Sequence, residues 1–348
     1  MCAIVGFISV NNTPPKEALI TFARLLYAGT CRGKDASGFM CPTPNGSAIR
    51  VSKAPGLPAA VLESLPTVAP RWMIGHNRQG TGGSPIDNEN NHPVISGNFA
   101  LVHNGTVRSQ GYVHKGGTDK LPYPHAAEVD SQLLVETLDI LVNDRNWKLP
   151  SAISKGIPRY TTGNYTGIAV DGSSPNTLHL FRDGNPLVLA FDPLLRIIWL
   201  ASTKEIILSA CGKTVRHLDG LFVERIPPAD GSLLFSELST NDYLTITVGD
   251  NDISWMEDKL ESPTYSTTTV QGNCGTPSYV PPVTAGGNKV AGRPHHNKHA
   301  HDPINRPFPM RYSSPGEKPA TGTPAGTSPV PFTYSGDEAG YSSDYGED

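Results

Sequence analysis

The 348-residue chain lacks several features that mark specialised classes of protein. No apolar run approaches the ~20 residues that a membrane-spanning helix needs. The first basic residue is Lys16, so the initial apolar stretch has no charged segment before it and does not resemble a signal peptide. Charged residues make up only 17%, and a formal net charge of −4 gives no basic excess that would indicate nucleic acid. We expect a cytoplasmic protein that binds neither membranes nor nucleic acid.

Cysteine is also scarce, and its spacing excludes two common uses. The 5 cysteines form no CxxC pair, so the sequence predicts neither a zinc site nor a disulfide framework. Reduced thiols in a reducing compartment are the expected state. The residues concerned are Cys2, Cys31, Cys41, Cys211 and Cys274.

Isoleucine and leucine almost disappear towards the end of the chain. The segment 255–348 is rich in Pro, Gly, Ser and Thr and ends in an acidic run with interspersed Tyr. Such a composition cannot bury enough apolar surface to offset the entropy of ordering, so we predict a disordered tail. Four histidines within 295–301 could chelate a metal ion, but a metal site needs ligands that a fold fixes in place, and no fold is expected here. We interpret them as part of a polar linker and predict neither a metal site nor a cofactor.

The preceding part, 2–254, is expected to form one α+β domain. Helical periodicity indicates helices at 16–27, 128–142 and 203–211. Predicted strands come in consecutive groups with few helices between them, which favours a layered α+β sandwich over a doubly wound parallel sheet. The predicted strands are 3–9, 37–42, 71–76, 98–103, 166–171, 177–182, 187–191 and 196–201.

Cys2 is the first residue with chemical potential. It directly follows Met1 and opens the apolar strand 3–9. Removal of Met1 would leave one residue with both a thiol and a free α-amine, whose unperturbed pKa lies near 8. A nucleophile and a base on one residue are the minimum that an N-terminal nucleophile hydrolase requires. The alternative is an ordinary buried cysteine in a strand.

Two further motifs stand at the ends of apolar strands. Arg78 lies beside a glycine-rich loop, where its guanidinium can present two parallel donors to a carboxylate. The amide of Asn104 and the backbone N–H of Gly105 can together stabilise an oxyanion. Ordinary explanations are a solvated arginine in a surface loop and a common Asn-Gly turn.

Asp130 begins the long predicted helix. A carboxylate there either complements the positive helix N-terminus or pairs with a substrate ammonium group. Nucleophile, carboxylate binder, oxyanion donors and ammonium binder are together what hydrolysis of a free α-amino acid amide requires. The combination therefore favours catalysis, although each motif by itself has a simpler explanation.

These motifs resemble, in order, those of the class II glutamine amidotransferases, which are N-terminal nucleophile hydrolases. The matching elements are Cys-x-Ile-x-Gly, Arg-Gly-x-Asp-x-x-Gly, His-x-Arg-x-x-x-x-Gly, Asn-x-His-Pro and His-Asn-Gly, and the similarity spans roughly residues 2–235. The resemblance implies a four-layer αββα sandwich. It also implies hydrolysis of glutamine to glutamate and ammonia, with no cofactor.

Carried over position by position, the resemblance assigns roles to individual residues. Cys2 would be the nucleophile and its α-amine the general base, with Asn104 and Gly105 as the oxyanion hole. Arg78 would bind the α-carboxylate of glutamine and Asp130 its α-ammonium. The remaining positions are Thr81 as a substrate contact and Arg32, His92 and His103 as supporting residues.

The sequence departs from the family in two ways. Gln79 and Gly82 stand where many sugar-amidating members have Trp and His. No synthase module is recognisable after the domain, so we expect ammonia to pass to a separately encoded synthase or amidoligase. Two alternatives stay open: an N-terminal nucleophile amidase acting on another amide, and a catalytically idle module whose tail mediates interactions.

Overall fold

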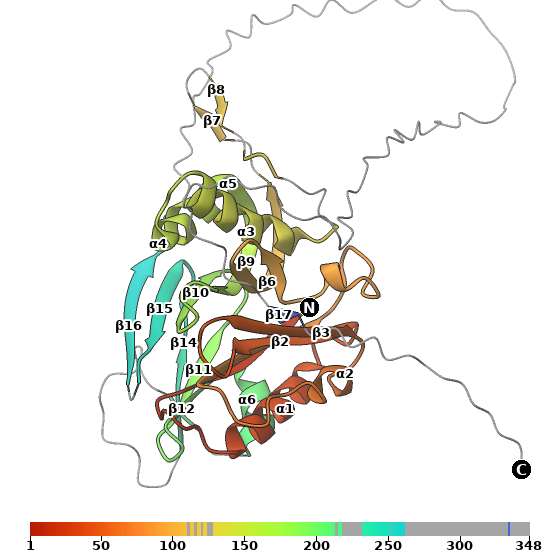
Figure 1. Cartoon of the computed structure of the whole chain (residues 1–348), viewed down its shortest axis with the longest axis vertical. Coiled ribbons are helices and arrows are strands. Elements are labelled where there is room, and N and C mark those ends of the chain that lie inside the picture. Colours follow the sequence, from red (N-terminus) through yellow and green to blue (C-terminus); the bar gives the residue numbers. More distant parts are fainter. Residues whose placement is uncertain are drawn as a thin grey trace, which may run out of the picture. The chain divides into compact units, whose positions relative to one another are not determined.

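The computed structural model describes most of the chain up to Glu261. The described residues are 1–109, 112–114, 117–119, 121–123, 128–212, 215–217, 232–250, 252–261 and 333–334. They form two β-sheets stacked between helices (Figure 1). The predicted disordered tail and the histidines of 295–301 lie outside the described residues, apart from the stretches 255–261 and 333–334.

The larger sheet contains nine strands. They are β1 (Ala3–Ser9), β2 (Ala36–Pro42), β3 (Ile49–Pro55), β4 (Trp72–Arg78), β11 (Val188–Asp192), β12 (Ile197–Ala201), β13 (Val215–His217), β14 (Leu233–Glu237) and β17 (Thr333–Tyr334). Their order is β13-β14-β11-β12-β1-β4-β2-β3-β17. All neighbours are antiparallel except the two outermost pairs, β13–β14 and β3–β17, which are parallel.

The smaller sheet has six strands and is antiparallel throughout. Its strands are β5 (Val94–Ser96), β6 (Phe99–Ser109), β9 (Thr161–Asp171), β10 (Thr177–Asp183), β15 (Asp242–Val248) and β16 (Ile253–Lys259). Their order is β16-β15-β10-β9-β6-β5. A separate two-stranded ribbon joins β7 (Tyr112–His114) and β8 (Gly117–Asp119).

Helices cover the outer face of each sheet (Figure 1). On the larger sheet lie α1 (Glu17–Gly29), α2 (Ala59–Leu62) and α6 (Lys204–Cys211). On the smaller sheet lie α3 (Asp130–Asp139), the π-helical turn η2 (Ile140–Asp144), α4 (Leu149–Ser151), the π-helical turn η3 (Ala152–Gly156) and α5 (Ile157–Tyr160). A short 3₁₀ turn, η1 (Asn88–Asn90), precedes β5.

The alternating side chains of β1 explain the layering. Val5 and Phe7 pack on the helix side of the larger sheet, whereas Ile4 and Ile8 pack in the cluster that joins the two sheets. Because successive side chains of a strand point to opposite faces, a fully apolar strand such as β1 needs both of its faces covered. A third apolar cluster lies between the smaller sheet and its helices. The predicted four-layer αββα sandwich is confirmed.

Every predicted strand has a counterpart in the structure. The strands that were not predicted are β3, β5, β7, β8, β13, β14, β15, β16 and β17. In β3 the polar residues Ser52 and Lys53 are buried and break the apolar pattern, and most of β16 is exposed. The predicted helix 128–142 divides at Asp139, where α3 passes into η2. β16 also continues past the domain boundary predicted at residue 254.

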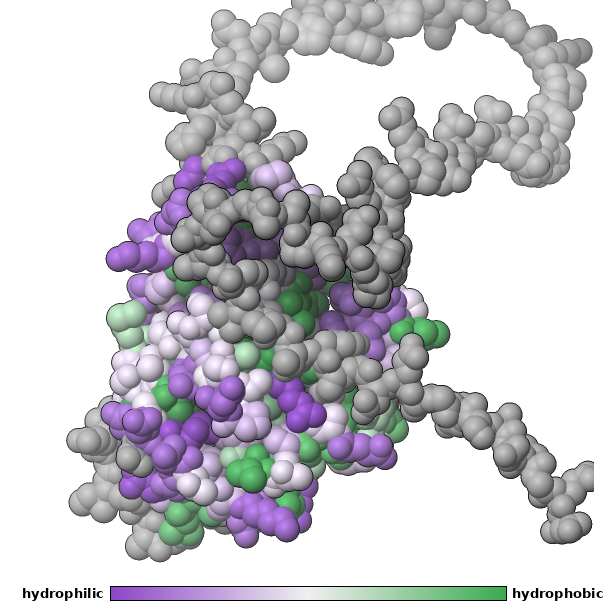
Figure 2. Space-filling view, in the orientation of Figure 1, coloured by the Kyte–Doolittle hydropathy of each residue, from purple (hydrophilic) through white to green (hydrophobic). Residues whose placement is uncertain are grey.

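The surface of the described residues carries no dominant apolar area on the face shown in Figure 2, where hydrophobic side chains form small separate groups among polar ones. Among the described residues, none of the helices is long and apolar enough to cross a membrane.

Candidate active site

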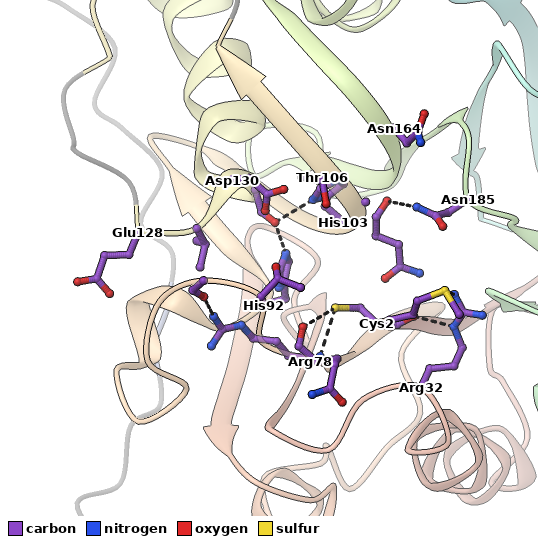
Figure 3. Close-up of a pocket in the computed structure, with 18 residues that line it drawn as sticks. Cys2, Arg32, Arg78, His92, His103, Thr106, Glu128, Asp130, Asn164 and Asn185 are labelled. Atoms are coloured by element: carbon purple, nitrogen blue, oxygen red, sulfur yellow. Dashed lines mark hydrogen bonds between the residues drawn. The ribbon is translucent and has the colours of Figure 1, made fainter. Parts of the chain in front are cut away.

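The sheet register brings the predicted catalytic and binding residues to one place. In the antiparallel pair of β1 and β4, Ala3 lies opposite Asn77, so the start of β1 meets the end of β4. β6 of the facing sheet and the N-terminus of α3 border the same cavity, which has a volume of about 540 Å³ (Figure 3). Every predicted site residue lines it: Cys2, Arg32, Arg78, Thr81, His92, His103, Asn104, Gly105 and Asp130.

The Cys2 sulfur sits against the backbone of the loop after β4. The N–H of Gln79 donates to Cys2 Sγ at 3.3 Å, and Sγ lies 3.6 Å from the Gln79 carbonyl oxygen. Burial raises the pKa of the Cys2 thiol, while the Gln79 N–H, the chain-terminal amine and Arg78 act in the opposite direction. Arg32 donates through Nε to the Cys2 carbonyl at 2.7 Å, which fixes the backbone of the nucleophile.

Arg78 is 3% exposed and ends β4 beside the cavity. Its Nη1 donates to Asn91 Oδ1 at 3.0 Å, and its Nη2 donates to the carbonyls of Gly82 and, at 3.0 Å, Gly83. The guanidinium is therefore held by a side chain on one side and by the loop 79–83 on the other. This arrangement keeps a cation at the cavity wall with its plane fixed.

Asp35 holds the same loop and was given no role from the sequence. Its Oδ2 accepts from Gly80 N at 2.7 Å and from Gln79 Nε2 at 3.0 Å, and its own N–H donates to the Arg78 carbonyl at 2.9 Å. Gln79 thus pairs with Asp35. The aspartate of the Arg-Gly-x-Asp turn is the sequence feature that could have indicated this role.

Asn104 and Gly105 line the cavity from within β6, not from a strand end or turn as predicted, because β6 stays paired with β9 as far as Ser109. Asn104 is 2% exposed; its Nδ2 donates to Ser202 Oγ at 2.7 Å, and its buried Oδ1 has no hydrogen-bond partner among the described residues. Ser202 Oγ also accepts from Ile4 N at 2.8 Å. A hydroxyl can both donate and accept a hydrogen bond. Rotating the Asn104 amide by a half-turn therefore keeps the hydrogen bond with Ser202, now with Oδ1 as acceptor, and puts Nδ2 where Oδ1 was.

Gly105 adopts a backbone conformation that favours glycine, with φ of 150°. A Cβ at this position would lie 1.9 Å from the Asn164 carbonyl oxygen and 2.7 Å from His103 Nε2. The absence of a side chain therefore permits the close approach of β9 to β6 here. Asn185 adds to this wall by donating to the Asn104 carbonyl at 3.2 Å.

Asp130 is the first residue of α3, and its carboxylate accepts from Val107 N at 2.9 Å. The helix N-terminus favours a negative charge at this point. Both the ordinary and the functional explanations offered for Asp130 from the sequence therefore have a structural basis, since the carboxylate supports the helix and also borders the cavity.

Three histidines and Ser131 form a buried polar cluster beneath the cavity. Ser131 Oγ lies 2.8 Å from His92 Nε2 and 2.9 Å from His103 Nδ1 (Figure 3). His76 Nε2 donates to the His103 carbonyl at 3.0 Å, and the rings of His76 and His92 lie 4.0 Å apart. Burial lowers the pKa of His76 to about 3, that of His103 to about 4, and that of His92 well below its usual value. All three rings are neutral at pH 7.

Neither His76 nor Ser131 was given a role from the sequence, because a buried histidine or serine carries no local signal of its partners. Within the described ranges, no group of His, Cys, Asp and Glu side chains is arranged to hold a metal ion. The cavity instead gathers a thiol, two arginines, two carboxylates and amide groups, which suits a small zwitterionic amide.

In sequence, the chain is similar to enzymes whose names include glutamine. No family model matches the chain. It is 29% identical over 193 residues to the glutamine–fructose-6-phosphate aminotransferase (isomerizing) of Wigglesworthia glossinidia brevipalpis, and 31% identical over 203 residues to that of Haemophilus influenzae. Each alignment covers 54% of this chain and 30% of the relative, so the chain spans about a third of the length of these curated relatives.

A solved structure has a similar fold. The glutamine phosphoribosylpyrophosphate amidotransferase of B. subtilis, solved with ADP and GMP, matches with a TM-score of 0.50 and 17% identity, covering 75% of this chain and 49% of that one. At this identity the match supports the fold alone. The sequence relatives, which are aminotransferases named for glutamine, agree with the resemblance to the glutamine amidotransferases.

Proposed function

We propose that this chain is a glutaminase that hydrolyses the side-chain amide of glutamine to glutamate and ammonia. The observation that carries the proposal is the meeting of Cys2, Arg78, Asn104, Gly105 and Asp130 around one cavity. These residues come from four different elements, and each supplies a function that an N-terminal thiol lacks. The sequence relatives, whose names include glutamine as a substrate, agree with this chemistry.

The reaction begins after Met1 is removed, because only then does Cys2 carry a free α-amine. This amine takes the thiol proton, directly or through a water, and Sγ attacks the side-chain carbonyl of glutamine. The Gly105 N–H and the rotated Asn104 amide stabilise the tetrahedral oxyanion. The protonated amine returns its proton to the leaving nitrogen, and ammonia departs. Water then hydrolyses the γ-glutamyl thioester and regenerates the thiol.

Arg78 and Asp130 orient the substrate. Arg78 pairs with the α-carboxylate and Asp130 with the α-ammonium, so an amide without either group loses both ion pairs. Thr81 borders the same side of the cavity and contacts the bound amino acid, while Arg32, His92 and His103 support the site. An amidase for non-amino-acid amides has no use for the Arg78–Asp130 pair, which disfavours that alternative.

We further propose that the ammonia is used by a separate synthase or amidoligase. The matched region corresponds to about a third of the relatives, whose names describe transfer to a sugar phosphate. The free cysteines Cys2, Cys31, Cys41 and Cys211 agree with a reducing, cytoplasmic setting.

The deciding experiment combines intact mass spectrometry with an assay for glutamate release. The wild-type chain should lack Met1 and release glutamate from glutamine, and Cys2→Ala should abolish the release. Cys31→Ala is the matched control, since Cys31 is exposed and does not line the cavity. A retained Met1 with no release, even in the presence of candidate acceptor enzymes, would refute the proposal. Faster hydrolysis of non-amino-acid amides would favour the other amidase.

A further inference from the structure

The two ion-pairing residues of the proposed site belong to different layers of the sandwich. Arg78 ends β4 of the larger sheet, and Asp130 begins α3 outside the smaller sheet. The α-carboxylate and α-ammonium of an amino acid are attached to one carbon atom. Both protein groups must therefore converge on one point, and binding sites of this kind need placement to within about 0.5 Å.

A buried chain of contacts links Arg78 to Asp130. Arg78 Nη1 donates to Asn91 Oδ1 at 3.0 Å. The next residue, His92, places Nε2 2.8 Å from Ser131 Oγ, and Ser131 directly follows Asp130. Asn91, His92 and Ser131 are 0%, 5% and 2% exposed, so water does not compete for these contacts. We call these three residues the buried bracket.

The Asn91 end of the bracket is also held from other directions. Asn91 Nδ2 donates to the Pro85 carbonyl at 2.7 Å and to Asn88 Oδ1 at 3.0 Å. The backbone carbonyl of Asn91 accepts from the buried ammonium of Lys53 at 3.1 Å. Every polar atom of the Asn91 side chain is thus engaged, which leaves the side chain a single orientation toward Arg78.

The hydroxyl of Ser131 joins His92 of the bracket to the helix α3. A hydroxyl donates one hydrogen bond and accepts others, whereas each neutral imidazole has one N–H and one lone pair. Ser131 Oγ can therefore accept from one ring and donate to the other, and it contacts both His92 and His103. Removing it would leave two buried imidazole nitrogens without a partner. Such a loss destabilises the buried cluster.

We propose that Asn91, His92 and Ser131 are positioning residues that hold Arg78 and Asp130 at the separation that selects a free α-amino acid. The inference rests on the proposed function, because it assigns these residues to glutamine binding. None of the three acts on the reacting amide. Their removal should therefore weaken recognition of the zwitterion and leave the thiol chemistry intact.

The test uses Ser131→Ala in the full chain without Met1, with Ser131→Thr as the conservative variant that keeps the hydroxyl. Ser52→Ala is the control, because Ser52 is also buried and hydrogen bonded, to Ser64 at 2.6 Å, but does not line the cavity. We expect Ser131→Ala to raise the KM for glutamine about tenfold, as loss of ~1.4 kcal/mol of binding would do, and to change kcat much less. Ser131→Thr should recover most of the wild-type KM.

Alkylation of Cys2 provides a second measurement that does not depend on turnover. Iodoacetamide reports only thiol reactivity, whereas a diazo-ketone analogue of glutamine also needs the α-amino and α-carboxylate contacts. Ser131→Ala should slow the reaction with the glutamine analogue about tenfold and leave the iodoacetamide rate unchanged. If Ser131→Ala does not fold, Ser131→Cys, which keeps the volume but weakens the hydrogen bonds, takes its place in the KM measurement.

The outcomes separate the inference from the proposed function. A wild-type enzyme that hydrolyses glutamine, with an unchanged KM in Ser131→Ala, would overturn the bracket and keep the glutaminase. Equal slowing by both alkylating reagents would also overturn it, because it would indicate general damage to the site. A wild-type chain that neither hydrolyses glutamine nor prefers the glutamine analogue would overturn both.

Discussion

Gly105 offers the sharpest test of the proposed oxyanion wall. Its φ is 150°, and a Cβ added to it would lie 1.9 Å from the Asn164 carbonyl oxygen and 2.7 Å from His103 Nε2. Neither neighbour is the free end of a flexible side chain, so Gly105→Ala must displace the backbone of β6 or β9. The displacement would occur where the Gly105 N–H is proposed to meet the oxyanion.

Two effects add up in the expected loss of stability. Backbone strain at a glycine-favouring conformation costs about 1–3 kcal/mol. Overpacking of a tight contact costs about 1–3 kcal/mol more. We expect Gly105→Ala to lower the free energy of unfolding by roughly 2–6 kcal/mol. Displacement of one oxyanion donor should also lower kcat for glutamine about 10²–10³-fold.

Gly46→Ala is the matched control. Gly46 also has a positive φ, 66°, but a Cβ there would meet nothing within 4 Å. Only the strain of the backbone conformation applies here, so the free energy of unfolding should fall by about 1–2 kcal/mol and activity should be complete. Urea unfolding at fixed protein concentration, with the slope checked for each variant, gives the stabilities. Equal unfolding midpoints for the two variants, with activity retained in Gly105→Ala, would refute the reasoning.

Three shorter predictions concern buried groups. Because burial lowers the pKa of His103 to about 4 and that of His76 to about 3, only the unfolded chain takes up these protons just below pH 6.5. Stability should fall from pH 6.5 to pH 4, by roughly 3 kcal/mol from His103 alone, and an unchanged urea midpoint at pH 5 would contradict this. Burial also raises the pKa of Cys41 to about 12, so alkylation of the native protein at pH 8 should modify exposed Cys31 before Cys41, as peptide mass spectrometry would detect. Phe22→Ala should lower the free energy of unfolding, measured in urea, by about 3–5 kcal/mol and leave the KM for glutamine unchanged. The Phe22 ring belongs to α1, is fully buried in the cluster on the helix side of the larger sheet, and does not line the cavity.

Much of the fold follows from local patterns. The strand 3–9 is bounded as predicted, because a continuous apolar run with alternating partners needs cover on both faces. The helix predicted at 203–211 is observed as α6, and it ends at Gly212 in a left-handed conformation that suits glycine. β16 was not predicted because nearly all of its residues are exposed and show no alternation between buried and exposed positions. Its strand conformation depends on pairing with β15.

The sequence by itself determined the chemical inventory of this protein: a thiol at position 2, an arginine at a strand end, an adjacent Asn-Gly pair and a carboxylate at a helix start. Each is a property of a residue type and its local context, so it can be identified without the fold. Only the tertiary structure decided that these groups share one cavity, because β1, β4, β6 and α3 meet through long-range sheet register. It also placed Ser131 between His92 and His103, since a buried hydroxyl finds its partners by packing and not by spacing.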